Sequence, residues 1–331
     1  MKAIVHEGKK GLDGVTFTHM SEVEPRPGEV KVRLKAAGLN HRDLLVPNRR
    51  NDGDPPVILG SDGAGVIEVV GEGVTGIQVG DEVMINPGLG WKKNSDAPPE
   101  GFEILGFPSH GTFAESVVVP AESVVKKPGH YSWEEAAVLP LSALTAYRAL
   151  FTRAKVKMGD TVLIPGIGSG VATYLLQFAK AAGAYVIVTS RSEMKLEAAR
   201  RLGADRVIHT NREWDQELKG EMIDIVIESV GAATFNRSLN VLRPGGTMVT
   251  FGASAGDVVH LNIREFFYGQ YNLLGSTMGS HEEFEDMVDF VQRHNMKPVL
   301  DRVFPLSSAL EAFHYMNRAE QFGKIALDIN G

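Results

Sequence analysis

Apolar and polar positions alternate over short runs in the first 125 residues, and the runs end in glycine-containing turns. Residues 30–34, 66–70 and 82–85 follow this two-residue period, which predicts half-buried strands. Residues 86–106 lack the period and hold five glycines and prolines in their first fourteen positions, so we expect a surface loop there. The pattern predicts a mostly antiparallel, β-rich region at this end of the chain.

A different pattern begins at Ser132, which together with Glu135 is a helix-capping signature. We expect this helix to run in pieces through residue 150, with a break at Pro140. Short apolar strands and helices then alternate at residues 161–164, 171–182, 185–189, 193–202, 207–208, 223–227 and 247–251, followed by a helix at 282–293 and a strand at 325–329. Fully apolar strands between helices are typical of a parallel sheet covered on both faces, so we predict a doubly wound α/β domain.

Composition narrows the class of protein without identifying it. A chain of 331 residues favours two domains, and 43% hydrophobic with 23% charged residues is ordinary for a soluble protein. No apolar run reaches 18 residues and the amino terminus lacks the apolar core of a signal peptide, so we expect no membrane span and a cytoplasmic location. The net charge of −7, without a basic tract, argues against nucleic acid as a partner.

The chain contains no cysteine. This absence excludes disulfides, cysteine-ligated zinc sites and a thiol nucleophile, but it identifies no activity by itself.

The segment 163–172 carries closely spaced glycines between an expected strand and an expected helix. Gly166, Gly168 and Gly170 allow the backbone to approach a pyrophosphate, and the helix start at Ser169 and Val171 offers free N–H groups to the anion. The spacing departs from the strict dinucleotide-binding pattern, and an ordinary tight turn is the alternative.

The end of the next expected strand indicates which dinucleotide is bound. An acidic residue there would hold the ribose 2′-hydroxyl of NAD, but this chain has Ser190 and Arg191, with Lys195 one turn later. A guanidinium flanked by hydroxyls suits a 2′-phosphate, so NADP(H) is favoured over NAD(H). The alternative is a solvated helix start.

Several segments together resemble the medium-chain dehydrogenase/reductase family. The resemblance rests on residues 60–67, 70–74, 79–83, 111–115, 181–184, 202–205 and 242–246. It implies a GroES-like catalytic domain formed by residues 1–123 and 276–331, around a Rossmann nucleotide-binding domain formed by residues 124–275.

The family includes zinc-dependent alcohol dehydrogenases and zinc-free reductases. At the positions where the zinc branch carries metal ligands, this chain has Asn40, Ser61, Asp62 and Leu141. These side chains do not make a tetrahedral zinc site, so we expect no metal. The chain is most similar to the zinc-independent, quinone oxidoreductase-like branch, whose members reduce quinones or activated C=C bonds. An improvised site from His41, Asp43 and Asp62 is the alternative.

Without a metal, a substrate carbonyl must be polarised by hydrogen bonds while hydride reaches the β-carbon. The resemblance puts Asn40 and Asp43 near the nicotinamide, Asn40 as a donor and Asp43 as its support. Both residue types also favour a strand-to-helix cap, which is the alternative role. The tyrosine that some branch members carry next is missing from residues 44–50, which leaves the proton donor open.

The resemblance also assigns further contacts to an NADP(H) cofactor. They are Thr145, Ser229, Val230, Phe251, Gly252, Ala253, Ser276, Thr277, Met278 and Lys324. Aromatic residues at 266–268 and 271 belong either to the core or to the seam of a homodimer. Two other functions stay open at this point, a metal-dependent alcohol dehydrogenase and a non-catalytic NADPH-binding protein.

Overall fold

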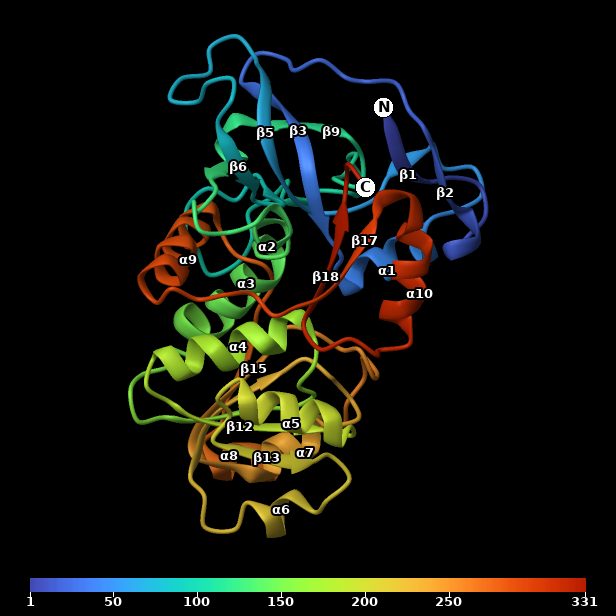
Figure 1. The fold of residues 1–331 in the computed structure, drawn as a ribbon. Coiled ribbons are helices and arrows are strands. Elements are labelled where there is room, and N and C mark those ends of the chain that lie inside the picture. The colour runs from blue at the N-terminus through green and yellow to red at the C-terminus, as the bar shows by residue number, and fades with distance from the viewer. The chain divides into compact units, whose positions relative to one another are not determined.

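The computed structural model describes residues 1–331, and the chain divides into two compact units. Unit 1 consists of Met1–Leu144 and Gly279–Gly331, and unit 2 consists of Thr145–Met278. Figure 1 shows how the two ends of the chain combine in unit 1, because the blue strand β3 (Glu29–Gly38) and the red strand β18 (Lys324–Asp328) lie in one sheet.

Unit 1 is built on a seven-stranded sheet in the order β10-β6-β5-β3-β18-β17, with β9 also pairing with β3. Its further strands are β5 (Asp62–Val70), β6 (Glu82–Ile85), β9 (Ser116–Pro120), β10 (Val124–Lys126) and β17 (Leu300–Pro305). All pairs are antiparallel except β17 with β18. The predicted strands at 30–34, 66–70 and 82–85 are confirmed as parts of β3, β5 and β6.

Shorter elements surround this sheet. A second sheet has the order β2 (Val15–His19), β1 (Lys2–His6), β4 (Val57–Ile58), and the 3-10 turns are η1 (Leu12–Gly14), η2 (Ala121–Ser123) and η4 (Leu306–Ser308). The helices are α1 (His41–Arg49), α2 (Trp133–Ala137), α9 (His281–Arg293) and α10 (Ala309–Asn317), and α3 (Pro140–Tyr147) crosses the boundary between the units. The expected loop at 86–106 contains the two-residue strands β7 (Gly88–Leu89) and β8 (Glu103–Ile104), which are too short for an alternating pattern to reveal.

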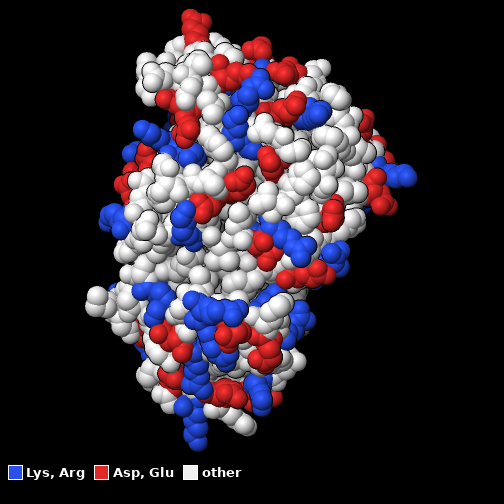
Figure 2. Space-filling model, viewed as in Figure 1, with Lys and Arg blue, Asp and Glu red and all other residues white.

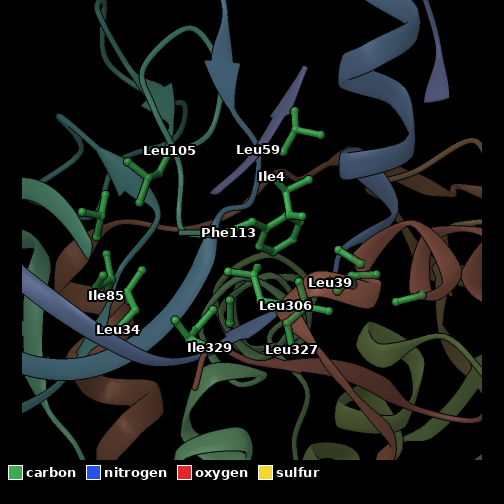
Figure 3. Close-up of a cluster of buried hydrophobic side chains, with 14 of the residues drawn as sticks. Ile4, Leu34, Leu39, Leu59, Ile85, Leu105, Phe113, Leu306, Leu327 and Ile329 are labelled. Atoms are coloured by element: carbon green, nitrogen blue, oxygen red, sulfur yellow. The ribbon is translucent and has the colours of Figure 1, made fainter. Parts of the chain in front are cut away.

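The core of unit 1 forms around Phe113, which has no exposed surface (Figure 3). Side chains from the first and last parts of the chain, including Ile4 and Leu327, pack in the same cluster. Burying each large apolar side chain contributes about 1.5–3 kcal/mol. Gly60 has a φ of +97°, and a Cβ there would lie 2.3 Å from the Phe113 ring, so packing requires this glycine of the 60–67 motif.

Unit 2 is a parallel six-stranded sheet with the order β13-β12-β11-β14-β15-β16, which confirms the doubly wound α/β prediction. Its strands are β11 (Thr161–Ile164), β12 (Tyr185–Ser190), β13 (Arg206–His209), β14 (Ile223–Glu228), β15 (Leu242–Thr250) and β16 (Asn272–Gly275). Its helices are α4 (Gly170–Ala181), α5 (Glu193–Arg201), α6 (Trp214–Glu217), α7 (Phe235–Val241) and α8 (Ile263–Gly269), and a π-helical segment, η3, covers Arg148–Arg153. The strand β16 and the helices α6, α7 and α8 were not predicted.

The boundary between the units differs from the predicted one by about twenty residues at the first crossing. Residues 124–144 belong to unit 1 because β10 pairs with β6 and the Tyr131 hydroxyl donates to the Met296 carbonyl over 2.6 Å. A Cβ on Gly38 would lie 2.5 Å from the Ala137 carbonyl oxygen, so α2 packs directly on β3. The predicted cap and break are confirmed, since Ser132 and Glu135 bond reciprocally and α3 begins at Pro140.

Charged side chains of both signs lie intermixed on both units (Figure 2). Typical pairs are Lys180 with Asp205 and Arg206 with Glu221, at 2.7 and 2.9 Å, and each such pair contributes about 0–1 kcal/mol. None of the helices combines the length and apolar character that crossing a membrane requires.

Candidate functional site

Asn40 stands at the N-cap position of α1, where β3 ends and the helix begins. Asp43 supports this start, because its Oδ2 accepts the Asn40 backbone N–H over 2.8 Å. The Asn40 side-chain amide points to other partners: its Nδ2 donates to Asp62 Oδ2 over 2.9 Å. Asn40 and Asp43 together form a capping box at the start of α1, as the cap interpretation predicts, and the Asn40 amide also belongs to a buried polar cluster.

That polar cluster consists of Asn40, Asp62, Ser142 and Lys324, and each member is at most 5% exposed. Lys324 Nζ donates to Asn40 Oδ1 over 2.7 Å, and Ser142 Oγ donates to the same oxygen over 3.2 Å. Asp62 Oδ1 accepts the Leu141 backbone N–H over 2.8 Å. Asn40 Nδ2 carries two hydrogens and donates one of them to Asp62, so the second N–H remains available to another acceptor.

Burial dominates the electrostatics of this region. Loss of solvent raises the pKa of Asp43 to about 7, and the nearby Arg42 guanidinium opposes the rise. Burial likewise raises the pKa of Asp62 and lowers the pKa of Lys324, and in each case the opposite charge of the partner works against the shift. Asp43 can thus hold a proton near neutral pH.

The four residues at the metal-ligand positions of the zinc branch do come together, but their polar groups already have hydrogen-bond partners within the protein. Ser61 Oγ donates to the Leu105 carbonyl over 2.7 Å and accepts from Arg42 over 2.5 Å. Leu141 contributes only its backbone N–H, and an ammonium lies 3.4 Å from Asp62 Oδ2. His41 is exposed on α1, whereas Asp62 is buried, and no group of three His, Asp or Glu side chains is placed to hold a metal. This donor set does not fit zinc.

The glycine turn of unit 2 joins β11 to α4. Gly166 has a φ of +74° and Gly168 a φ of +132°, and a Cβ on Gly168 would lie 2.8 Å from the Lys195 side chain. Ser169 caps α4 by accepting the Ala172 N–H over 3.2 Å, which leaves the N–H groups of Gly170 and Val171 at the open helix start. The turn fits a pyrophosphate, because only glycine leaves this backbone accessible.

The end of β12 lies beside that turn. The Ile167 backbone N–H donates to the Thr189 carbonyl over 2.8 Å, and Ser190 Oγ accepts the Ser192 N–H over 3.1 Å. Arg191 is exposed, and its side chain makes no hydrogen bond or ion pair within the protein. His209 approaches the Arg191 carbonyl oxygen with Nε2 at 3.0 Å, so the backbone of this loop is held while the guanidinium stays free.

The other residues assigned to the cofactor in unit 2, apart from Thr145 on α3, lie at the carboxyl ends of β14, β15 and β16. Ser229 and Val230 follow β14, Phe251, Gly252 and Ala253 follow β15, and Ser276, Thr277 and Met278 follow β16. The Ser276 hydroxyl is buried without a hydrogen-bond partner. Thr145 Oγ1 lies 4.0 Å from Met278 Sδ. These assignments gather at one edge of one sheet, where parallel sheets bind their ligands, and their roles stay predictions.

Two supporting residues escaped the sequence interpretation. Glu228 has no exposed surface, and its carboxylate accepts from the Val230 and Gly231 N–H groups and from the hydroxyls of Thr234 and Ser238. An acid closing an apolar strand was the available signal. The sequence indicates Asp62 only as a possible metal ligand, and its pairing with Lys324, 262 positions away, has no local signal.

Comparison with known proteins identifies the family. The "Alcohol dehydrogenase GroES-like domain" family matches residues 26–129, and the "Zinc-binding dehydrogenase" family matches residues 170–293. A zinc-type alcohol dehydrogenase-like protein of Schizosaccharomyces pombe is 38% identical, with 100% of this chain and 99% of that protein covered. A crotonyl-CoA reductase of Streptomyces avermitilis is 31% identical over 93% of this chain and 81% of its own.

A solved structure described as an NAD-dependent alcohol dehydrogenase superposes with a TM-score of 0.92 and 37% identity, covering 99% of this chain and 100% of that one. The fold of each unit and the extent of these matches agree with the resemblance found in the sequence motifs. Unit 1 is a GroES-like domain, unit 2 is a Rossmann domain, and the chain belongs to the medium-chain dehydrogenase/reductase superfamily of oxidoreductases.

Proposed function

We propose that this protein is an NADPH-dependent, zinc-independent reductase of quinones or α,β-unsaturated carbonyl compounds. The observation that carries the proposal is the single remaining N–H of Asn40, held in a buried cluster by Asp62 and Lys324. A fixed N–H donor stabilises negative charge on a carbonyl oxygen without a metal. The similarity to a crotonyl-CoA reductase supports this substrate class.

The reduced nicotinamide supplies the hydride in this reaction, and the chain's own residues supply binding and polarisation. Gly166, Gly168 and the start of α4 hold the pyrophosphate through backbone N–H groups. Arg191 and Ser190 hold the 2′-phosphate through charge-assisted hydrogen bonds. Asn40 donates to the oxygen on which charge collects, and water delivers the final proton.

The test is an oxidation screen with NADPH and with NADH against quinones, enones and acryloyl thioesters, each with and without a chelator. We expect turnover with NADPH that the chelator leaves unchanged. Alcohol oxidation that the chelator abolishes would instead support the zinc-dependent alternative, to which the names of several relatives point. Cofactor binding without any turnover would support a non-catalytic role.

We further propose that the protein is a homodimer joined through β16, the edge strand of the unit 2 sheet. Exposed apolar side chains lie on this strand and on residues 258–268 before it, whereas Phe266 packs against the core. The exposed ones are Val258, Ile263, Phe267, Tyr268 and Leu273. A second copy paired along β16 would cover this apolar surface. Light scattering should give twice the chain mass of 35.9 kDa, and Phe267→Glu should halve it.

A further inference from the structure

The polar cluster of unit 1 contains a cation that belongs to the chain itself. Lys324 is 3% exposed and lies at the first position of β18. Its Nζ donates to the Leu39 carbonyl over 2.6 Å and to Asn40 Oδ1 over 2.7 Å, and it lies 3.4 Å from Asp62 Oδ2. An ammonium has three hydrogens, so each of them has an acceptor within the protein.

We propose that the Lys324 ammonium is the resident cation of this cluster, in the place where the family description implies zinc, and that it is a positioning residue for Asn40. The first part stands on the cluster geometry alone. The second part rests on the proposed function, because it concerns the donor that the reaction uses.

Charge explains why this ammonium and a metal exclude each other. Asp62 is the only carboxylate in the cluster, and its two oxygens are occupied by Leu141, Asn40 and Lys324. A divalent ion bound to Asp62 would lie within a few ångströms of the ammonium and be repelled by it. The buried carboxylate already has a compensating charge, which a buried acid requires.

The same charges fix the orientation of the Asn40 amide. Its oxygen faces two donors, Lys324 and Ser142, and its NH2 group faces the Asp62 carboxylate. Rotating the amide by half a turn would direct N–H hydrogens at the ammonium and the oxygen at the carboxylate, and both contacts would be repulsive. Lys324 thereby determines which way the remaining N–H of Asn40 points.

Zinc content tests the first part directly. Untagged wild type and Asp62→Asn are incubated with zinc sulfate, desalted and analysed by mass spectrometry for metal. We expect the same zinc content in both proteins, because Asp62 holds an ammonium and no metal. A wild type that holds about one zinc per chain more than Asp62→Asn would overturn the proposal.

Thermal stability tests the charge pairing without any substrate. Lys324→Met leaves Asp62 buried and unpaired, and we expect its melting temperature to fall by about 5 °C or more. The double variant Asp62→Asn/Lys324→Met removes both charges and should melt higher than Lys324→Met. The proposal is overturned if the double variant melts at the same temperature as the single one, or lower. If Lys324→Met does not fold, recovery of a folded double variant still supports the pairing, and failure to recover it contradicts the pairing.

Lys127→Met is the matched control for these measurements. Lys127 is also buried in unit 1, but Glu82, its acidic partner at 3.2 Å, is exposed and can be hydrated when the lysine is lost. We expect a smaller fall in melting temperature than for Lys324→Met. An equal fall would mean that any buried lysine of unit 1 has this effect, which contradicts a special pairing with Asp62.

Kinetics test the positioning role. With the substrate that wild type reduces fastest, Lys324→Met should lower kcat by about 10–100-fold while KM for NADPH changes little. In an Asn40→Ala background the same substitution should lower kcat less than about twofold, because the group it positions is gone. Equal losses in both backgrounds would refute a role through Asn40. A wild type that reduces none of the compounds would refute the proposed function, whereas the zinc and melting measurements would still test Lys324.

Discussion

The two candidate regions of this protein are built in opposite ways. The polar cluster of unit 1 consists of buried side chains from four separate segments, joined by charges and hydrogen bonds. The edge of the unit 2 sheet consists mainly of backbone at the ends of strands β11, β12, β14, β15 and β16, with the charged Arg191 left exposed. One region fixes a single donor within the protein, and the other offers many N–H groups to a charged ligand.

This difference determines how each region responds to substitution. No other group can replace a lost side chain of the cluster, because each of its partners is buried and already hydrogen-bonded. At the sheet edge, backbone groups share the binding, so the loss of one side chain removes only part of it. We therefore expect the largest effects in unit 1 and the smallest at the exposed residues of unit 2.

Asn40→Ala should have the largest effect. It removes the only N–H that the cluster leaves for a substrate carbonyl, and loss of one such donor lowers kcat by about 100- to 1,000-fold. KM for NADPH should change little, since the cofactor is held by other groups. Steady-state NADPH oxidation measures both constants.

Asn48→Ala is the control for that substitution. Asn48 lies on the same helix, is exposed, and donates only to the Leu44 carbonyl over 2.9 Å. We expect wild-type kinetics from it. A kcat for Asn40→Ala within threefold of wild type would show that the cluster serves stability alone.

Asp43→Asn should change how stability depends on pH. The pKa of Asp43 is raised from 3.8 to about 7, so the folded protein keeps a proton there that the unfolded chain has lost. The contribution of Asp43 to the free energy of unfolding is complete below pH 4 and declines as pH rises to 7. At up to 1.36 kcal/mol per pH unit, with the slope halved at pH 7, wild type should lose about 2 kcal/mol from this group between pH 5 and 7, and Asp43→Asn should not.

Urea unfolding at pH 5, 6, 7 and 8 measures that difference. Asp81→Asn is the matched control, because Asp81 accepts the Gln78 backbone N–H over 2.8 Å in the same local arrangement on the surface. We expect it to keep the wild-type pH profile. Parallel profiles for wild type and Asp43→Asn would contradict a protonated Asp43 in the folded state.

Glu228→Gln extends the comparison to unit 2, because Glu228 is also buried and its carboxylate is fully hydrogen-bonded. Its carboxylate accepts from two backbone N–H groups and two hydroxyls, whereas an amide brings an NH2 group that cannot accept. We expect a loss of about 2 kcal/mol in the free energy of unfolding, together with weaker NADPH binding by calorimetry, because the 229–231 turn shifts.

Glu197→Gln provides the baseline for that measurement. Glu197 is 51% exposed and pairs only with arginines of its own helix. Its loss should change neither stability nor NADPH binding measurably. Equal effects from the two substitutions would mean that burial at Glu228 has no energetic consequence.

The contrast also explains which features the sequence could predict. The glycine turn that follows β11 and Arg191, which follows β12, lie within 30 residues of one another, and local spacing predicts their arrangement at one edge. The Asn40–Lys324 contact joins positions 284 apart and forms only when β18 pairs with β3. No period or motif marks such a pair, so Lys324 was assigned to the cofactor by resemblance and its partners were missed. The predicted boundary at residue 124 differs from the observed one for the same reason, because β10 pairs with β6, a strand about forty residues earlier.

Of the four substitutions predicted to have an effect, Arg191→Ala should have the smallest one, and it concerns only the choice of cofactor. The guanidinium has no partner in the protein, so its loss should leave stability unchanged. It should lower kcat/KM for NADPH about tenfold through the lost charge-assisted hydrogen bonds, and kcat/KM for NADH less than threefold. Arg201→Ala, which removes a 70% exposed arginine from α5, should leave both values unchanged.

The similarity to an NAD-dependent alcohol dehydrogenase makes this the sharpest comparison at the sheet edge. An equal fall with both cofactors would mean that Arg191 binds a group common to the two, and a wild type that prefers NADH would remove the 2′-phosphate from its role altogether.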